Sequence, residues 1–131
     1  MDYTYSEEYQ RIGEEVMRDV PELNYLLDAD IRVAFVASKK AKKRSKNSRT
    51  CGECVKVQEL YKAFTPYDFL IVFYEPNIQH MNEAQLRILA EHELLHIGYE
   101  EGPEGPRYSI VPHDYEDFKQ IIDKYGTDWD K

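Results

Sequence analysis

The segment His92–His96 reads HELLH, and it lies in a run that has the boundaries of a single helix. Asn82 offers an N-cap, and Gln85 follows three residues later, as in a capping box. Gly98 is a residue type that commonly ends helices. The sequence therefore predicts a helix from about Glu83 to Ile97, and this helix constrains the fold because it must present two imidazoles to one point.

Residues four apart on a helix lie on one face, one turn above the other, so His92 and His96 could bind one metal ion. In this HExxH pattern, Glu93 could reach a water on that metal. A catalytic zinc site uses three protein ligands and a water. The pattern thus favours a hydrolase with Zn2+ as cofactor and Glu93 as catalytic base. The competing interpretation is a surface helix with polar residues at this spacing.

The third ligand must come from elsewhere in the chain, and His113 is the best candidate. It follows His96 by seventeen residues, across a segment rich in glycine and proline that can reverse the chain. We expect it to begin a last amphipathic helix, from about His113 to Tyr125. A carboxylate would also suit zinc, and the weaker alternatives are Glu116, Asp117, Glu100, Glu101 and Glu104.

Size and composition indicate one folded domain over residues 1–131, with 42% apolar and 13% aromatic residues. No apolar run approaches the roughly 20 residues that span a bilayer, so no membrane association is expected. The polar, acidic start is unlike a signal peptide. Two cysteines do not make a disulfide framework, which favours a cytoplasmic location.

The order of the other elements predicts an α+β domain, in which a small sheet packs on the HExxH helix. Ser6 is a candidate N-cap for a helix within residues 1–28, with Tyr5, Tyr9, Ile12 and Val16 at helical spacing. The expected strands are Ile31–Ser38, Asp68–Glu75 and the short Tyr108–Val111. Glu100–Pro106 should turn, and Val55–Phe64 is ambiguous between strand and short helix.

The net charge of −8 is unevenly distributed. Lys39–Arg49 contains seven cationic residues and no acid, which leaves −15 for the rest of the chain. We predict a solvated basic loop over residues 39–50. Contact with nucleic acid phosphates and docking of an acidic partner are the functional alternatives.

Cys51 and Cys54 form a CxxC pair, which we interpret as two ordinary loop thiols. A second cysteine pair for a structural zinc site is missing, and the surroundings do not resemble a thioredoxin βαβ unit. His80 is expected to be a loop histidine.

The segments YDFLIVFYEP, LRILAEHELLHI and VPHDYEDFKQIIDKYG resemble the phage metallopeptidase domain family, which is similar in plan to SprT-like zinc proteases. The resemblance covers about Ile31 to Gly126, and HELLHI and the HDxxxF segment are its most specific parts. It implies a zincin-type fold, with His92, His96 and His113 as zinc ligands and Glu93 as the catalytic acid/base.

The expected function is therefore that of a zinc metallopeptidase acting on protein or peptide substrates. The alternative is a catalytically silent zinc-binding module, nucleic-acid-associated through Lys39–Arg49. An oxyanion helper could be a tyrosine near the motif, and the candidates are Tyr99, Tyr108 and Tyr115. Asp114 and Asp117 are candidates for orienting a ligand histidine.

Overall fold

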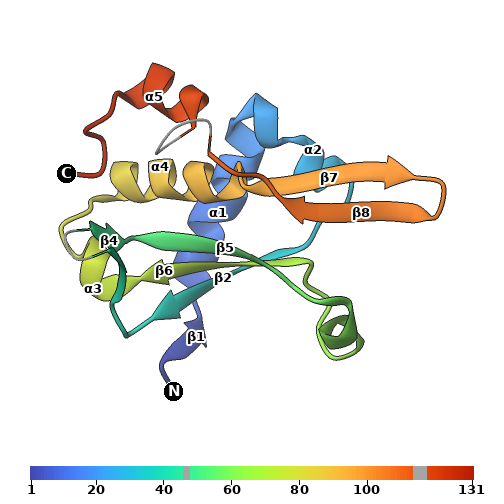
Figure 1. Ribbon diagram of the computed structural model, residues 1–131. Coiled ribbons are helices and arrows are strands. Elements are labelled where there is room, and N and C mark those ends of the chain that lie inside the picture. Colours follow the sequence, from blue (N-terminus) through green and yellow to red (C-terminus); the bar gives the residue numbers. More distant parts are fainter. Residues whose placement is uncertain (46–47, 114–117) are drawn as a thin grey trace.

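Two buried strands, β2 and β6, run parallel at the centre of a four-stranded mixed sheet of order β1-β2-β6-β5 (Figure 1). In this computed structural model the described residues are 1–45, 48–113 and 118–131. The elements, in chain order, are β1 (Tyr3–Tyr5), α1 (Glu7–Asp19), η1 (Pro21–Leu23), α2 (Tyr25–Asp28), β2 (Val33–Ser38), β3 (Lys42–Ser45), β4 (Ser48–Thr50), β5 (Gly52–Lys56), η2 (Glu59–Ala63), β6 (Phe69–Tyr74), α3 (Glu75–Ile78), α4 (Glu83–Leu94), β7 (Ile97–Gly102), β8 (Gly105–Ile110) and α5 (Lys119–Tyr125).

The core forms where alternate residues of the two central strands point the same way, as the period of a strand requires. Helices α1 and α4 add their apolar sides to this same cluster. The result is a small α+β domain, as the sequence predicts. The inward residues are Val33, Phe35 and Ala37 from β2 and Phe69, Ile71 and Phe73 from β6.

Helix α1 begins at the predicted cap, where the Ser6 hydroxyl accepts a hydrogen bond from the Tyr9 amide at 3.1 Å. Tyr9, Ile12 and Val16 are buried, which confirms their predicted helical face. Tyr5 does not belong to that face, because it ends strand β1 and is 54% exposed. The strand β1 before α1 was not predicted, and the short helices η1 and α2 follow α1.

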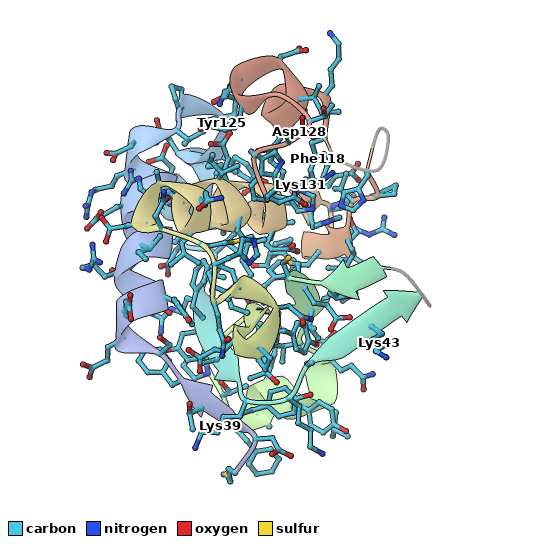
Figure 2. The ribbon with its side chains drawn as sticks, turned by 90° about the vertical axis from the view of Figure 1, so that its left-hand side faces the viewer. Lys39, Lys43, Phe118, Tyr125, Asp128 and Lys131 are labelled. Atoms are coloured by element: carbon cyan, nitrogen blue, oxygen red, sulfur yellow. The ribbon has the colours of Figure 1, made fainter. Side chains whose placement is uncertain are left out.

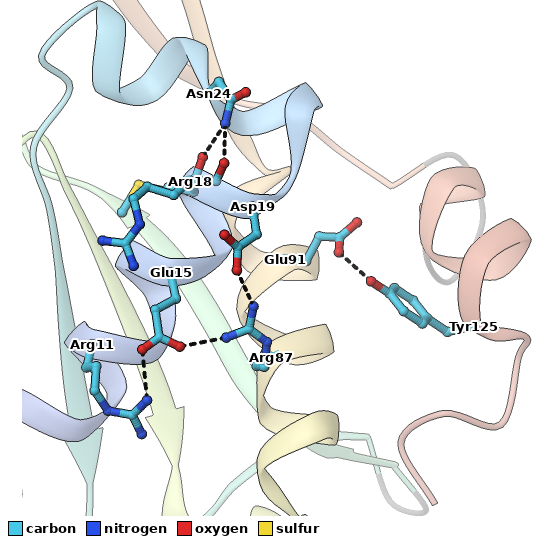
Figure 3. A network of polar contacts seen from close by, with 9 residues as sticks. Arg11, Glu15, Arg18, Asp19, Asn24, Arg87, Glu91 and Tyr125 are labelled. Carbon is cyan, nitrogen blue, oxygen red and sulfur yellow. Dashed lines mark hydrogen bonds and ion pairs between the residues drawn. The ribbon is translucent and has the colours of Figure 1, made fainter.

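A polar network joins α1 to α4 on the outer side of the core (Figure 3). The Arg87 guanidinium of α4 bridges Glu15 at 2.8 Å and Asp19 at 2.9 Å, both on α1. Arg11 also pairs with Glu15, at 3.0 Å. Shared carboxylates of this kind fix the relative register of two helices, although each exposed pair stabilises by only about 0–1 kcal/mol.

The basic segment is not the irregular loop that was expected. Strands β3 and β4 form an antiparallel hairpin, in which Lys42 pairs with Thr50 and Lys43 with Arg49. Lys and Arg have no strong β preference, so composition alone gives no strand pattern here. The ambiguous segment after it divides between β5 and the short helix η2.

Helix α4 starts as predicted, with both hydrogen bonds of the Asn82–Gln85 capping box present. It ends at Leu94, three residues before the predicted Ile97. Gly98 does not cap the helix but lies in β7, where a Cβ would come within 2.2 Å of the Ser109 hydroxyl of β8. The glycine is thus required by close cross-strand packing.

The predicted turn over Glu100–Pro106 is mostly strand, because β7 extends to Gly102 and β8 begins at Gly105. The predicted short strand near Tyr108 is confirmed as part of β8. The predicted last helix begins later than expected, since α5 starts at Lys119 and His113 lies in an irregular segment. None of the helices among the described residues is both long and apolar enough to cross a membrane.

Substituting Gly13→Ala should destabilise the fold. A Cβ at Gly13 would lie 2.2 Å from two ring atoms of Phe35, which is fully buried. Overpacking costs about 1–3 kcal/mol, which exceeds the gain of about 1 kcal/mol in helix propensity. Urea unfolding followed by circular dichroism measures the difference.

The matched control is Glu14→Ala, at the exposed neighbouring position of α1. It should leave the unfolding midpoint within about 0.5 kcal/mol of the parent. Equal stability of the Gly13→Ala protein and the parent would contradict the close α1–β2 packing.

Candidate metal centre

Helix α4 carries the HExxH residues on the side that is buried in the protein. His92 is 9% exposed and Glu93 is 4% exposed, although both are polar. Buried polar groups normally have specific hydrogen-bond partners or ligands. The burial of the His92 and Glu93 side chains therefore indicates a functional site.

His96 lies just after α4, where the last turn tightens. Its amide donates to the Glu93 carbonyl at 3.1 Å, a bond to the third preceding residue. The ring still faces His92, with 5.4 Å between ring centroids. Its Nδ1 lies 2.6 Å from the Val111 carbonyl oxygen. A carbonyl can only accept, so Nδ1 carries the proton and Nε2 is the nitrogen whose lone pair could bind a metal.

His113 reaches the other two histidines through the β7–β8 hairpin. The hairpin register places Ile110 opposite Ile97, and the Val111 amide donates to the His96 carbonyl at 2.6 Å. Two residues later, the His113 ring lies 4.3 Å from the His96 ring and 4.7 Å from the His92 ring, centroid to centroid. The expected turn back to the motif is therefore present, although the predicted helix start at His113 is wrong.

The three histidines lie close enough to bind a metal ion. One ring nitrogen from each lies within 4.8 Å of the others. The His113 and His92 Nε2 atoms are 2.9 Å apart, while two ligands on tetrahedral zinc with bonds of 2.0–2.1 Å stand about 3.3 Å apart. A widening of this pair by a few tenths of an ångström would bring it to that spacing. Three neutral imidazoles suit zinc, copper, iron or nickel better than calcium or magnesium.

The Glu93 carboxylate stands beside the histidines without being a member of their cluster. Its oxygens lie 3.8 Å from His92 Nε2 and 4.0 Å from His96 Nε2. On its other side is Gly52 of β5, where a Cβ would lie 3.2 Å from the Glu93 Cγ and Oε2 atoms. The absence of a side chain at Gly52 leaves room for the carboxylate between α4 and the sheet.

These residues form the floor of a cleft with a volume of about 510 Å³. One wall is the start of β5 together with the β3–β4 hairpin, and the opposite wall is α4 and the C-terminal segment. Trp129 of that segment lines the cleft, with its ring 6.1 Å from the His92 ring. The segment is held by the Gln85 side-chain amide, which donates to the Trp129 and Lys131 carbonyls at 3.2 and 3.1 Å.

The cysteine pair was predicted to be two ordinary loop thiols, but it borders the candidate site. Cys51 and Cys54 both line the cleft, and Cys54 lies within β5. Burial raises the pKa of the Cys54 thiol, and the charges of Glu93 and Glu53 raise it further. A thiol that resists ionisation is a poor nucleophile, which argues against a redox pair.

A buried carboxylate next to the motif attaches the C-terminal helix to α4. Glu91 is 2% exposed and accepts a hydrogen bond from Tyr125 of α5 at 2.8 Å (Figure 3). Lys124, also on α5, donates to the same carboxylate at 2.9 Å. Burial and then the bond to Glu91 raise the pKa of Tyr125, so the phenol stays a donor. Phe118, just before α5, packs its ring 4.9 Å from that of His96 (Figure 2).

A family model described as "Putative phage metallopeptidase" matches residues 1–131. The chain belongs to this phage metallopeptidase family. No curated protein and no solved structure gives a significant match. The family name implies a metal, and the three clustered histidines are where the chain could hold the ion.

Of the other residues that the sequence brought forward, Tyr99 and Tyr108 lie in the β7–β8 hairpin and are not among the residues that line the cleft. Tyr99 donates to Glu101 at 2.7 Å and its ring is 5.9 Å from that of Tyr108. Glu100, Glu101 and Glu104 also belong to this hairpin or its turn and are outside the histidine cluster. Asp114, Tyr115, Glu116 and Asp117 fall outside the described residues.

Sequence reasoning missed the roles of Gly52, Glu91 and Trp129. The glycine inside the CxxC pair was a usable signal, since a glycine in a strand often marks a close approach. Glu91 comes immediately before the motif on a helix with a buried face, and a buried carboxylate needs a hydrogen-bond donor or a cation as partner. That requirement was a usable signal. The single tryptophan of the chain gave no signal for its position.

Removing the third imidazole should lower metal affinity. We expect His113→Ala to weaken zinc binding by more than about 100-fold, because loss of outer partners alone costs about 10–100-fold. Elemental analysis gives the stoichiometry, and competition with a chromogenic chelator gives the affinity.

The control is His80→Ala. The His80 Nε2 lies 2.8 Å from the Asp130 carbonyl and is not in the cluster. Zinc binding should be unchanged in this variant. Equal zinc content in the two variants would remove His113 from the ligand set.

Proposed function

We propose that the chain is a zinc-dependent peptidase in which His92, His96 and His113 hold the ion and Glu93 is the general base. The observation that carries the proposal is the convergence of three imidazoles beside a buried carboxylate, whose oxygens lie 3.8 and 4.0 Å from two of the ring nitrogens. Membership of the phage metallopeptidase family supports it.

The chemistry divides between the ion and the residues around it. When bound, zinc lowers the pKa of its water toward neutral and polarises the substrate carbonyl. Glu93 accepts the proton of the attacking water and passes it to the leaving amine. The hydrogen bond from His96 Nδ1 to Val111 keeps the ring oriented and its Nε2 available throughout. Gly52 leaves the space in which the carboxylate moves between these positions.

The substrate would lie along β5. This strand is at the edge of the described sheet, and its Gly52, Glu53 and Cys54 line the cleft beside Glu93. An extended peptide can add to such an edge through main-chain hydrogen bonds, which bind any sequence, while side-chain pockets set the preference. Peptide bonds of extended segments are therefore the proposed substrates.

The arrangement of an HExxH helix against a small mixed sheet supports a zincin-type fold similar in plan to the SprT-like proteases. Two free thiols suit a reducing compartment, which supports a cytoplasmic site of action.

Substituting Glu93→Gln should abolish hydrolysis while zinc stays bound. The amide keeps the shape of the side chain but cannot accept the proton, so kcat should fall by about 10²–10⁴. Turnover of a quenched fluorescent peptide library and elemental analysis are the two measurements.

Glu104→Gln, in the exposed turn between β7 and β8, is the matched control and should keep full activity. If the Glu93→Gln protein cleaves as fast as the parent, the general-base role is wrong. If the parent and the Glu93→Gln protein both hold zinc and neither cleaves any peptide, the chain is a silent zinc-binding module.

Gly52→Ala should reduce turnover with little change in zinc affinity. The new methyl group would press on the Glu93 carboxylate and also lie 3.3 Å from the Val72 carbonyl. Small displacements of a catalytic group can cost up to about 10²-fold, so we expect kcat to fall by about tenfold. Gly102→Ala serves as control, because its Cβ would meet nothing closer than 3.4 Å. Unaltered kinetics in the Gly52→Ala protein would show that Glu93 does not depend on this space.

A further inference from the structure

The β3–β4 hairpin brings the positive charge of the chain to the mouth of the cleft. Lys42 and Lys43 of β3 line the same cleft as His92 and Glu93. The hairpin belongs to the segment that holds seven cationic residues in a chain of net charge −8. Two of these seven cationic residues, Lys42 and Lys43, therefore lie beside the candidate metal centre.

Among the described side chains of this wall, Lys43 is the cation that could act on a ligand. Lys42 is engaged with Glu53 at 2.9 Å, and Lys40 pairs with Asp2 at 3.2 Å. Lys43 is exposed, and within residues 1–45, 48–113 and 118–131 no acidic side chain forms an ion pair with it. Figure 2 shows Lys43 at the side of the hairpin, away from Lys39, which lies near the N-terminal strand.

We infer that Lys43 binds an acidic side chain of the peptide in the cleft, so that acidic peptides are the preferred substrate class. The inference rests on the proposed function, because it assigns a ligand to the same cleft. Lys43 is then a specificity residue, which contacts the substrate away from the reacting atoms.

A peptide fits this cleft better than a nucleic acid strand. The cleft is also lined by Glu53, Glu93 and Asp130, and the chain outside Lys39–Arg49 carries −15. A continuous polyphosphate would meet these acids at successive positions. A single carboxylate can contact Lys43 while the neutral backbone of the peptide passes the acids.

The test uses zinc-loaded Glu93→Gln protein, so that binding is measured without cleavage. Two fluorescein-labelled peptides are compared by anisotropy: one carries a single glutamate, and its partner carries a glutamine at the same position. We expect tighter binding of the glutamate peptide at low salt. A further Lys43→Glu substitution should weaken that binding by about threefold to tenfold and leave the glutamine peptide nearly unaffected.

The matched control is Lys39→Glu, which makes the same change of charge in the same segment but outside the cleft lining. It should alter the preference by less than about twofold. Lys43→Gln, which removes the charge without reversing it, should give an intermediate loss.

Three results would overturn the inference. They are equal binding of the two peptides, an equal loss with Lys39→Glu and Lys43→Glu, and tighter binding of a single-stranded DNA of similar length than of the glutamate peptide. Equal cleavage of both peptides by the active enzyme would contradict the inference and leave the proposed function intact. Selective binding of the glutamate peptide without Glu93-dependent cleavage would support the inference and contradict the proposed function.

Discussion

The pair of hydrogen bonds between His96 and Val111 is the contact on which the candidate metal centre depends. The Val111 amide donates to the His96 carbonyl, and the His96 Nδ1 donates to the Val111 carbonyl, each at 2.6 Å. One residue at the end of α4 is thereby joined to one residue past the end of β8. The contact fixes the tautomer of one imidazole, and it also brings the chain to the point from which His113 meets the motif.

The rest of the structure holds this junction in place from several sides. The central strands supply the apolar surface under α4, and the Arg87 network on α1 fixes the helix from the outside. Glu91 attaches α5 over the same helix. The polar groups of the site are therefore carried by a helix with little freedom to move, which is what a catalytic constellation needs to keep its geometry.

The sequence was sufficient where local rules and tertiary packing agree. The capping box at Asn82 predicted the start of α4, and the apolar runs Ile31–Ser38 and Asp68–Glu75 predicted β2 and β6. The proximity of His113 to the motif was predicted from spacing, but its route was not. Gly98 looked like a helix stop, whereas it serves cross-strand packing with Ser109. That distinction depends on a partner eleven residues away, which a local pattern cannot contain.

The cleft lining was the least predictable part. Gly52, Cys54, Lys43 and Trp129 come from separate segments, and only the folded chain brings them together. The basic hairpin illustrates the difficulty, because its residues have weak strand preference and its register is set by pairing rather than by alternation.

The position of β5 at the sheet edge has a consequence for the solution behaviour of the protein. A strand with open backbone groups is a template for any extended chain, including the same strand of another molecule. Two copies that approached edge to edge would bring their lysine-rich hairpins against each other. Mutual repulsion of these hairpins would then oppose pairing through this edge, which is the one proposed to receive the peptide.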